Sequence, residues 1–146
     1  MVYQPLNTKK KAGVSIVPEQ FNQRDPVYLQ VVRHFKEQIA AGELQPGEEM
    51  PSRRELAGTL GINPNTVQRA YKRMEEEKLL YTEGNMPSKI TEDTSVLTQV
   101  RHELMLEAVE TFIAAVKPIG VSLEEVQHKI KEQFLLEDDQ DGGETI

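Results

Sequence analysis

Two short predicted helices separated by only three residues constrain the fold of this chain more than any other feature. The first begins at Ser52-Arg53-Arg54-Glu55, an S-x-x-E capping box placed just before an apolar run, and it ends at Gly61. The second begins at Asn63-Pro64, since Asn is a good N-cap and Pro wastes no N–H at the first helical position. Two helices joined by so short a Gly-containing turn are typical of a helix-turn-helix.

The second of these helices has two distinct faces. Apolar residues at i, i+3, i+4 and i+7 predict a buried face made of Val67, Ala70, Tyr71 and Met74. The same spacing, rotated about the helix, predicts an outward face made of Asn65, Gln68, Arg69 and Lys72. Amide and guanidinium groups bond base edges bidentately, and cations meet phosphates, so this face suits a DNA groove. An ordinary solvated helix face is the alternative.

A helix and a hairpin are predicted on either side of this motif. The helix opens at Asp25-Pro26 and stops at Gly42, with an apolar stripe of Tyr28, Val32, Phe35 and Ile39. A short strand is expected over 48–50. Strands over 79–82 and 88–91 flank a turn in which Gly84 and Asn85 tolerate positive φ. A hairpin placed directly after the second helix predicts a winged helix-turn-helix over 25–91.

The C-terminal third predicts two amphipathic helices over 92–136. The first covers 96–117, and the second follows the capping box Ser122-Leu123-Glu124-Glu125. Their apolar faces require a cover, and a second copy of the chain is the economical one; packing back on the same domain is the alternative. The predicted dimerisation residues are Val100, Leu104, Met105, Val109, Phe112, Ile113, Val116, Val126, Ile130 and Phe134.

The two ends of the chain carry no helical period. Residues 1–24 predict a flexible arm, in which 14–17 could add a short strand. Its Lys9-Lys10-Lys11 run is either a solvated charge cluster or a basic arm along DNA. Residues 137–146, rich in Asp, Glu and Gly, predict a disordered acidic tail.

The net charge of −7 is distributed unevenly along the chain. Residues 26–91 balance nine basic against nine acidic side chains, whereas residues 92–146 carry four basic and thirteen acidic ones. Between Arg53 and Arg73 only Glu55 opposes five cations. A local basic face of this kind is what phosphate contact requires, whatever the sign of the whole protein.

Several other classes of protein are disfavoured. The chain has no cysteine, which excludes disulfides and thiolate chemistry, and no apolar run approaches the ~20 residues of a membrane span. His34, His102 and His128 lie far apart without a metal-ligand spacing, so each is interpreted as structural or exposed. We therefore expect no enzyme, metal or cofactor, and a cytoplasmic protein.

The central residues resemble the GntR family of bacterial regulators. The matching string is Gly42-x-Leu44-x-Pro46-Gly47-x-x-Met50-Pro51-Ser52-x-Arg54-x-Leu56-Ala57-x-x-Leu60-Gly61-Ile62-x-x-x-Thr66-Val67-x-x-Ala70-Tyr71. The resemblance covers most of residues 26–91, about half of the chain. The short helical tail resembles the YtrA-like subfamily, which implies a homodimer formed through the C-terminal helices.

The resemblance also implies site residues. Arg54 would grip a phosphate, and the residues that open the second helix of the motif would contact bases. Pro64 replaces a residue that is often basic in relatives, and the hairpin tip lacks their Gly-basic-Gly pattern, so recognition is expected to rest mainly on that helix and Arg54. The full set of predicted DNA-contacting residues is Ser52, Arg53, Arg54, Asn63, Asn65, Thr66, Gln68, Arg69, Lys72, Asn85 and Lys89.

The sequence thus predicts a mainly α-helical protein with a small β-hairpin that binds double-stranded DNA. Its expected function is that of a transcription regulator, a repressor on a near-palindromic operator by family resemblance, acting as a homodimer. A winged-helix protein-interaction module without specific DNA binding is the alternative. Whether a small-molecule effector exists is not predicted by the sequence.

Overall fold

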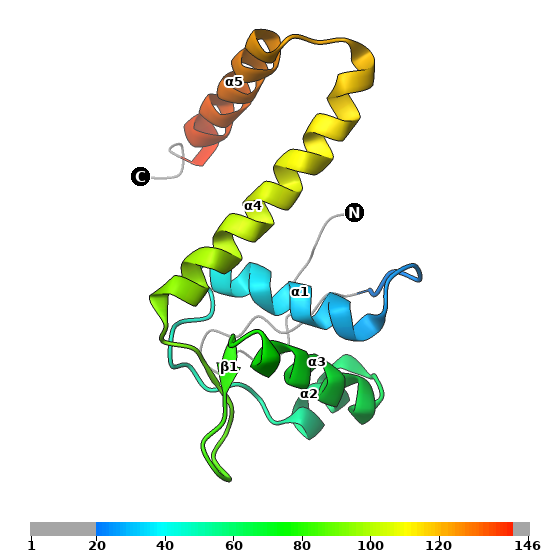
Figure 1. The fold of residues 1–146 in the computed structure, drawn as a ribbon, viewed down its shortest axis with the longest axis vertical. Helices are drawn as coiled ribbons and strands as arrows, with labels where there is room; N and C mark the ends of the chain where they lie inside the picture. The colour runs from blue at the N-terminus through cyan, green and yellow to red at the C-terminus, as the bar shows by residue number, and fades with distance from the viewer. Residues whose placement is uncertain (1–19, 142–146) are drawn as a thin grey trace. The chain divides into compact units, whose positions relative to one another are not determined.

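The computed structural model describes residues 20–141, which divide into two units after Met105. The expected arm, with its lysine run and its strand over 14–17, lies outside the described residues apart from 20–24. The first unit contains three helices and a hairpin, followed by the first half of a long helix (Figure 1). The second unit contains the rest of that helix and one more.

The first helix, α1, spans Val27–Ala40. Asp25 was expected to cap it, but Pro26 occupies the N-cap and no side chain caps the helix; Asp25 instead accepts a hydrogen bond from the Asn22 side chain. The predicted stop at Gly42 is confirmed, with φ of 76°. The Gly42 and Glu43 amides donate to Ile39 and Gln38, so the last carbonyls of the helix are satisfied by a Schellman motif.

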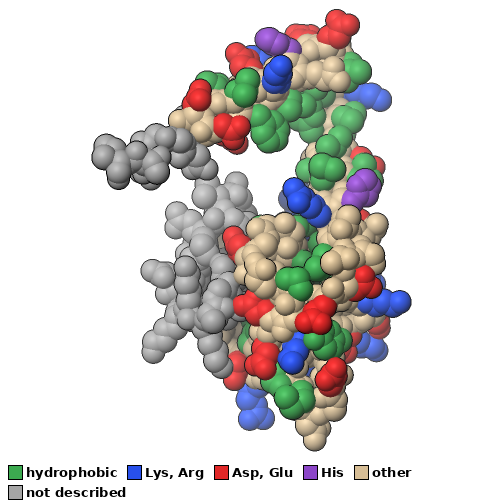
Figure 2. Space-filling model, turned by 90° about the vertical axis from the view of Figure 1, so that its left-hand side faces the viewer, with side chains coloured by type: hydrophobic (Ala, Val, Ile, Leu, Met, Phe, Trp, Pro, Cys, Tyr) green, Lys and Arg blue, Asp and Glu red, His purple; other side chains and the backbone are tan. Residues whose placement is uncertain are grey.

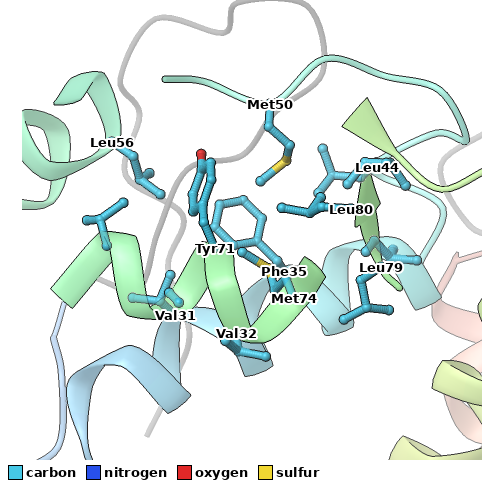
Figure 3. Close-up of a cluster of buried hydrophobic side chains, with 14 of the residues drawn as sticks. Val31, Val32, Phe35, Leu44, Met50, Leu56, Tyr71, Met74, Leu79 and Leu80 are labelled. Atoms are coloured by element: carbon cyan, nitrogen blue, oxygen red, sulfur yellow. The ribbon is translucent and has the colours of Figure 1, made fainter. Parts of the chain in front are cut away.

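The helix-turn-helix consists of α2, Arg53–Leu60, and α3, Pro64–Glu76. The inward face of α3 is buried as predicted, and Leu56 and Ala57 are the buried residues of α2. α3 packs against both α1 and α2 and is the central element of this unit. In Figure 3, Tyr71 and Phe35 lie at the centre of the core, with Leu56 on one side and Leu79 and Leu80 on the other.

The hairpin pairs β1, Leu80–Tyr81, with β2, Lys89–Ile90, in antiparallel register. Both strands are shorter than predicted. The strand expected over 48–50 is reduced to a single bridge between Glu49 and Lys89. Backbone hydrogen bonds from the Met50 amide to Ser88 (2.7 Å) and from the Ile90 amide to Glu48 (2.9 Å) still attach this segment to the hairpin. The predicted wing is therefore present and anchored.

The long helix α4 spans Thr94–Val116 and begins two residues before the predicted start. The Asp93 carboxylate explains the early start, because it accepts from the amide and hydroxyl of Ser95 at 2.9 and 2.6 Å, which also lowers the pKa of Asp93. A short 3-10 helix, η1 (Lys117–Ile119), ends at Gly120.

The last helix, α5, spans Leu123–Asp141, and the Ser122 hydroxyl accepts from the Glu125 amide as the capping box predicts. Disorder was expected from residue 137, and this is wrong for 137–141, which continue α5. The sequence offers a reason: acidic side chains do not stop a helix, and the first strong helix-breaking residues are Gly142 and Gly143.

Candidate nucleic-acid interface

Local hydrogen bonds hold the turn between α2 and α3 at a defined angle. The Ser52 hydroxyl accepts from the Glu55 amide at 3.1 Å and opens α2. Gly61 ends it in the left-handed region with φ of 62°, a conformation that costs glycine nothing, and the Ile62 amide donates to Ala57. The Asn63 side chain then accepts from the Asn65 amide at 2.8 Å to open α3. Asn63 and Ser52 thus act as caps, which leaves the Asn63 amide NH₂ and the Ser52 O–H as their free donors.

The outward face of α3 is polar and exposed as predicted. Asn65, Gln68, Arg69 and Lys72 are exposed, whereas Thr66 is half-buried. The side chains of Gln68 and Lys72 have no hydrogen bond or ion pair within residues 20–141. Unpaired amide and ammonium donors on one face of a helix are available to a ligand.

Arg54 is a further exposed cation of the helix-turn-helix. It is exposed in the first turn of α2, and the described part of the chain supplies it with no hydrogen bond or ion pair. The N-terminal turns of α2 and α3 also present backbone N–H groups and the positive end of each helix dipole. Such a surface favours phosphate oxygens.

Arg53, also predicted to contact DNA, has a different environment. Its guanidinium is paired with Glu75 at 2.9 Å and lies 4.8 Å from the centroid of the Tyr71 ring. Glu75 also accepts from the Thr82 hydroxyl at 3.1 Å, and Thr82 bonds Ser88 at 2.6 Å. Arg53 therefore links α2, α3 and both arms of the hairpin. The Arg53 guanidinium thus has a carboxylate and a ring as partners within the chain, and its contact with DNA stays a prediction.

Tyr71 is the buried support beneath Arg53. Its hydroxyl donates to the Pro51 carbonyl at 2.5 Å, which ties α3 to the segment before α2. Burial raises the pKa of Tyr71 well above its usual range, with the Arg53 cation opposing that rise and Glu55 adding to it. The phenol is therefore a permanent donor at physiological pH.

The wing presents little positive charge. Lys89, in β2, is half-buried opposite Tyr81, while the exposed residues of the tip include Glu83, Asn85 and Met86. Gly84 has φ of 56°; Asn85, expected to tolerate a left-handed backbone, does not adopt one. Asn85 and Lys89, two of the predicted DNA contacts, therefore belong to the hairpin and not to the polar face of α3.

The predicted dimerisation residues fall into two groups. Val100 is 3% exposed in the core of the first unit, and Leu104 is half-buried against that core, beside Val96 and Leu97. This corrects the assignment of Val100: its own domain covers it. The predicted residues with exposed side chains are Met105, Val109, Phe112, Ile113, Ile130 and Phe134, and Val116 and Val126 are half-buried.

The apolar face of α4 changes sides along the helix. At about 100° per residue, Val96, Leu97, Val100 and Leu104 centre on one side of the helix, and the large apolar residues of 105–116 centre on roughly the opposite side. The first group packs on the core, and the second is exposed at 39% for Phe112 and 41% for Ile113. Green side chains gather on the surface of the C-terminal helices in Figure 2. Contiguous exposed apolar surface of this kind marks an interaction site.

Two contacts of the site were not predicted from the sequence. Arg69 of α3 lies over the ring of Tyr28 in α1, with its guanidinium carbon 4.3 Å from the ring centroid. Glu75 joins Arg53 to the hairpin. Both contacts connect residues on different elements, so no periodic spacing in the sequence could reveal them.

Other functional features are limited. No group of His, Asp and Glu residues within 20–141 could hold a metal ion. None of the helices in that range is long and apolar enough to cross a membrane. The exposed polar face of α3, the capped turn and the hairpin define a winged helix-turn-helix, the fold class of many DNA-binding regulators.

Comparison with known proteins agrees with this class. Residues 27–90 match the bacterial regulatory proteins of the gntR family. The HTH-type transcriptional regulator YhcF of Bacillus subtilis is 33% identical over 112 residues, which span 77% of this chain and 93% of YhcF. The HTH-type transcriptional repressor YtrA of the same bacterium is 34% identical over 108 residues, which span 73% of this chain and 83% of YtrA.

Solved structures give the same result. A GntR family transcriptional regulator from Listeria monocytogenes has a TM-score of 0.71 at 31% identity, covering 77% of this chain and 98% of that one. A transcriptional regulator from Oenococcus oeni has a TM-score of 0.67 at 31% identity, covering 79% and 96%. The chain belongs to the GntR family of DNA-binding transcription regulators, and the resemblance to YtrA-like proteins is confirmed.

Proposed function

We propose that this protein is a transcriptional repressor that binds a near-palindromic operator as a homodimer. The observation that carries the proposal is the exposed face of α3, on which Gln68 and Lys72 have no partner within the described residues. Two copies of this face would enter successive major grooves about one helical turn apart (~34–36 Å). The name of YtrA, a repressor, supports repression over activation.

Different residues would position the protein and read the sequence. Arg54 and Lys72 are exposed cations and would bind phosphates, which fixes the register of the helix on the duplex. Asn65 and Gln68 would read base edges, since carboxamides bond adenine N6 and N7 bidentately. Thr66 is half-buried, and its hydroxyl would contact the DNA backbone or a base edge.

The second half of α4 supports the homodimer. Its apolar residues lie opposite the face that packs on the core, so folding of the first unit does not bury them. Family resemblance favours a second copy of the same chain as the partner, and the stripe of α5 that includes Ile130 and Phe134 would extend the interface.

Selection of bound fragments from the source genome, followed by binding titrations, tests the proposal. We expect one enriched sequence with two related half-sites, and an affinity that falls steeply with salt because counterions are released. Gln68→Ala should cost about 1–3 kcal/mol and relax specificity at one base pair of each half-site. Binding without sequence preference or without salt dependence would instead favour a protein-interaction module.

A further inference from the structure

Arg69 and Tyr28 form a contact that joins the recognition helix to α1. The Arg69 guanidinium carbon lies 4.3 Å from the centroid of the Tyr28 ring, well within the range of a cation–π interaction. Tyr28 is in the first turn of α1 and is half-buried against the core, so the ring is a supported platform. Arg69 is exposed on the outward face of α3.

Stacking leaves the bonding edges of Arg69 available. A guanidinium is planar and carries its five N–H donors in that plane, so a ring against one face blocks none of them. Within residues 20–141, Arg69 has no hydrogen bond and no ion pair, whereas Arg53 and Arg73 are paired with Glu75 and Glu77 at 2.9 and 2.7 Å. Arg69 is therefore the arginine of α3 whose donors are unoccupied.

We infer that Tyr28 is a positioning residue for DNA recognition, whose ring holds Arg69 with its donor edge presented to acceptors on the DNA. The inference rests on the proposed function, because it assigns a role within the same interface. A free arginine loses rotamer freedom when it binds; an arginine already stacked on a ring loses less. The Tyr28 ring thus raises the affinity for DNA, because it orders Arg69 before binding.

The acceptors on the DNA would be two neighbouring oxygen or nitrogen atoms, because the Arg69 guanidinium can bind such a pair with two of its N–H groups. A guanine edge offers O6 and N7, and a phosphate offers two oxygens. The two sources differ in their consequences. Loss of a base contact relaxes sequence preference, whereas loss of a phosphate contact weakens all sequences about equally and lowers the salt slope by about 1.

A double-mutant cycle in the full-length protein, on the selected operator, tests the inference. Arg69→Ala should weaken binding roughly tenfold or more, and Tyr28→Leu roughly three- to tenfold, because leucine keeps the packing and loses the ring face. Tyr28→Leu added to Arg69→Ala should cause no further loss. Tyr28→Phe, which keeps the ring, should bind within about twofold of the natural protein.

Matched variants separate positioning from a merely structural role. Lys72→Ala removes another exposed cation of α3, one that has no hydrogen bond, ion pair or ring contact among the described residues. Tyr28→Leu should therefore add its full effect to that variant. Circular dichroism and thermal unfolding check that Tyr28→Leu remains folded. Repeating the titrations on random DNA and across salt concentrations distinguishes a base from a phosphate as the acceptor.

Several results would overturn the inference. Additive losses from Tyr28→Leu and Arg69→Ala would show that the two side chains act independently. An equal loss in Tyr28→Phe and Tyr28→Leu would assign the effect to the phenol hydroxyl. Unchanged binding by Arg69→Ala would remove the arginine from the interface while leaving the proposed function standing. Failure of the natural protein to select any operator would instead overturn the proposed function, and this inference with it.

Discussion

Arg53 and Arg54 are adjacent in the sequence, but the fold gives them different surroundings. Arg54 is exposed and has no partner within 20–141, whereas Arg53 is held between Glu75 and the ring of Tyr71. The direction in which each side chain leaves the first turn of α2 produces this difference, because consecutive helical residues are about 100° apart. The same residue type therefore has two roles.

This pair makes a direct prediction. Arg54→Met should weaken operator binding and reduce the salt slope by about 1, while the free energy of unfolding changes by less than about 0.5 kcal/mol. Arg53→Met should lower the free energy of unfolding by about 1 kcal/mol, because it breaks the link to Glu75 and the ring contact. Urea unfolding and salt-dependent titrations measure both quantities. Equal salt slopes for the two variants would contradict the assignment.

Lys78 is a second residue whose conformation invites a test. Its φ of 61° makes it a non-glycine residue in the left-handed region, at the end of α3, where its amide donates to Glu75 at 3.0 Å. Lys78→Gly should stabilise the protein by about 1 kcal/mol, since glycine adopts this conformation without the Cβ clash. Lys78→Ala is the control, because it removes the same charge and keeps the Cβ. Similar unfolding midpoints for the two variants would mean that backbone strain is not the cause.

At the scale of elements, Glu77 connects the end of α3 to α1. Its carboxylate accepts from Lys36 of α1 and from Arg73 of α3, each at 2.7 Å. Partial burial raises the pKa of Glu77, but the hydrogen bonds from Lys36 and Arg73 outweigh it and lower that pKa below the ordinary value of 4.5. The ionised form is therefore the one that stabilises the contact between the two helices.

This linkage predicts a pH dependence. A carboxyl group whose pKa is lowered by folding contributes stability above its unfolded pKa and loses it as the pH falls through the folded value. The stability advantage of the natural protein over Glu77→Gln should thus be present at pH 6 and shrink as the pH falls below 4.5. Glu76→Gln, which alters an exposed neighbour without an ion pair within 20–141, should show a smaller change. Urea unfolding at each pH measures the difference.

At the scale of the whole molecule, the change of face along α4 separates folding from assembly. Residues up to Leu104 pack on the core of the first unit, and the apolar residues of 105–116 lie on the opposite side of the helix. A deletion from residue 96 would therefore remove Val100 from the core as well as the proposed interface. Single substitutions in the second half of α4 test assembly without that damage.

Ile113→Glu and Thr111→Glu form a matched pair for this purpose. Ile113 is 41% exposed on the apolar face, and Thr111 is exposed on the other side of the same turn. Ile113→Glu should weaken self-association about a hundredfold, because a dimer would bury an unpaired charge, and operator affinity should fall with it. Light scattering and titration with operator DNA measure the two effects. An unchanged dimer in Ile113→Glu, or an equal loss in Thr111→Glu, would place the interface elsewhere.

The helix-turn-helix could be predicted from the sequence alone, because its helix ends and its turn depend on residues that are close together in the chain. The capping residues Ser52 and Asn63, the turn at Gly61 and the 3.6-residue period of α3 all act within a few positions of one another. The same local rules predicted the hairpin and the exposed polar face. The acidic composition predicted disorder from residue 137, whereas α5 continues through Asp141, because acidic side chains do not by themselves end a helix.

Which of these polar and apolar residues remain free depends on how the helices and the hairpin pack together. Val100 is buried in the core, Arg53 is paired with Glu75, and Arg69 is stacked on Tyr28. Each of these contacts joins residues that are far apart in the sequence. A spacing pattern specifies the face on which a side chain lies, but it carries no information about what lies opposite. The contacts that turn a polar helix face into an organised interface arise when the elements pack.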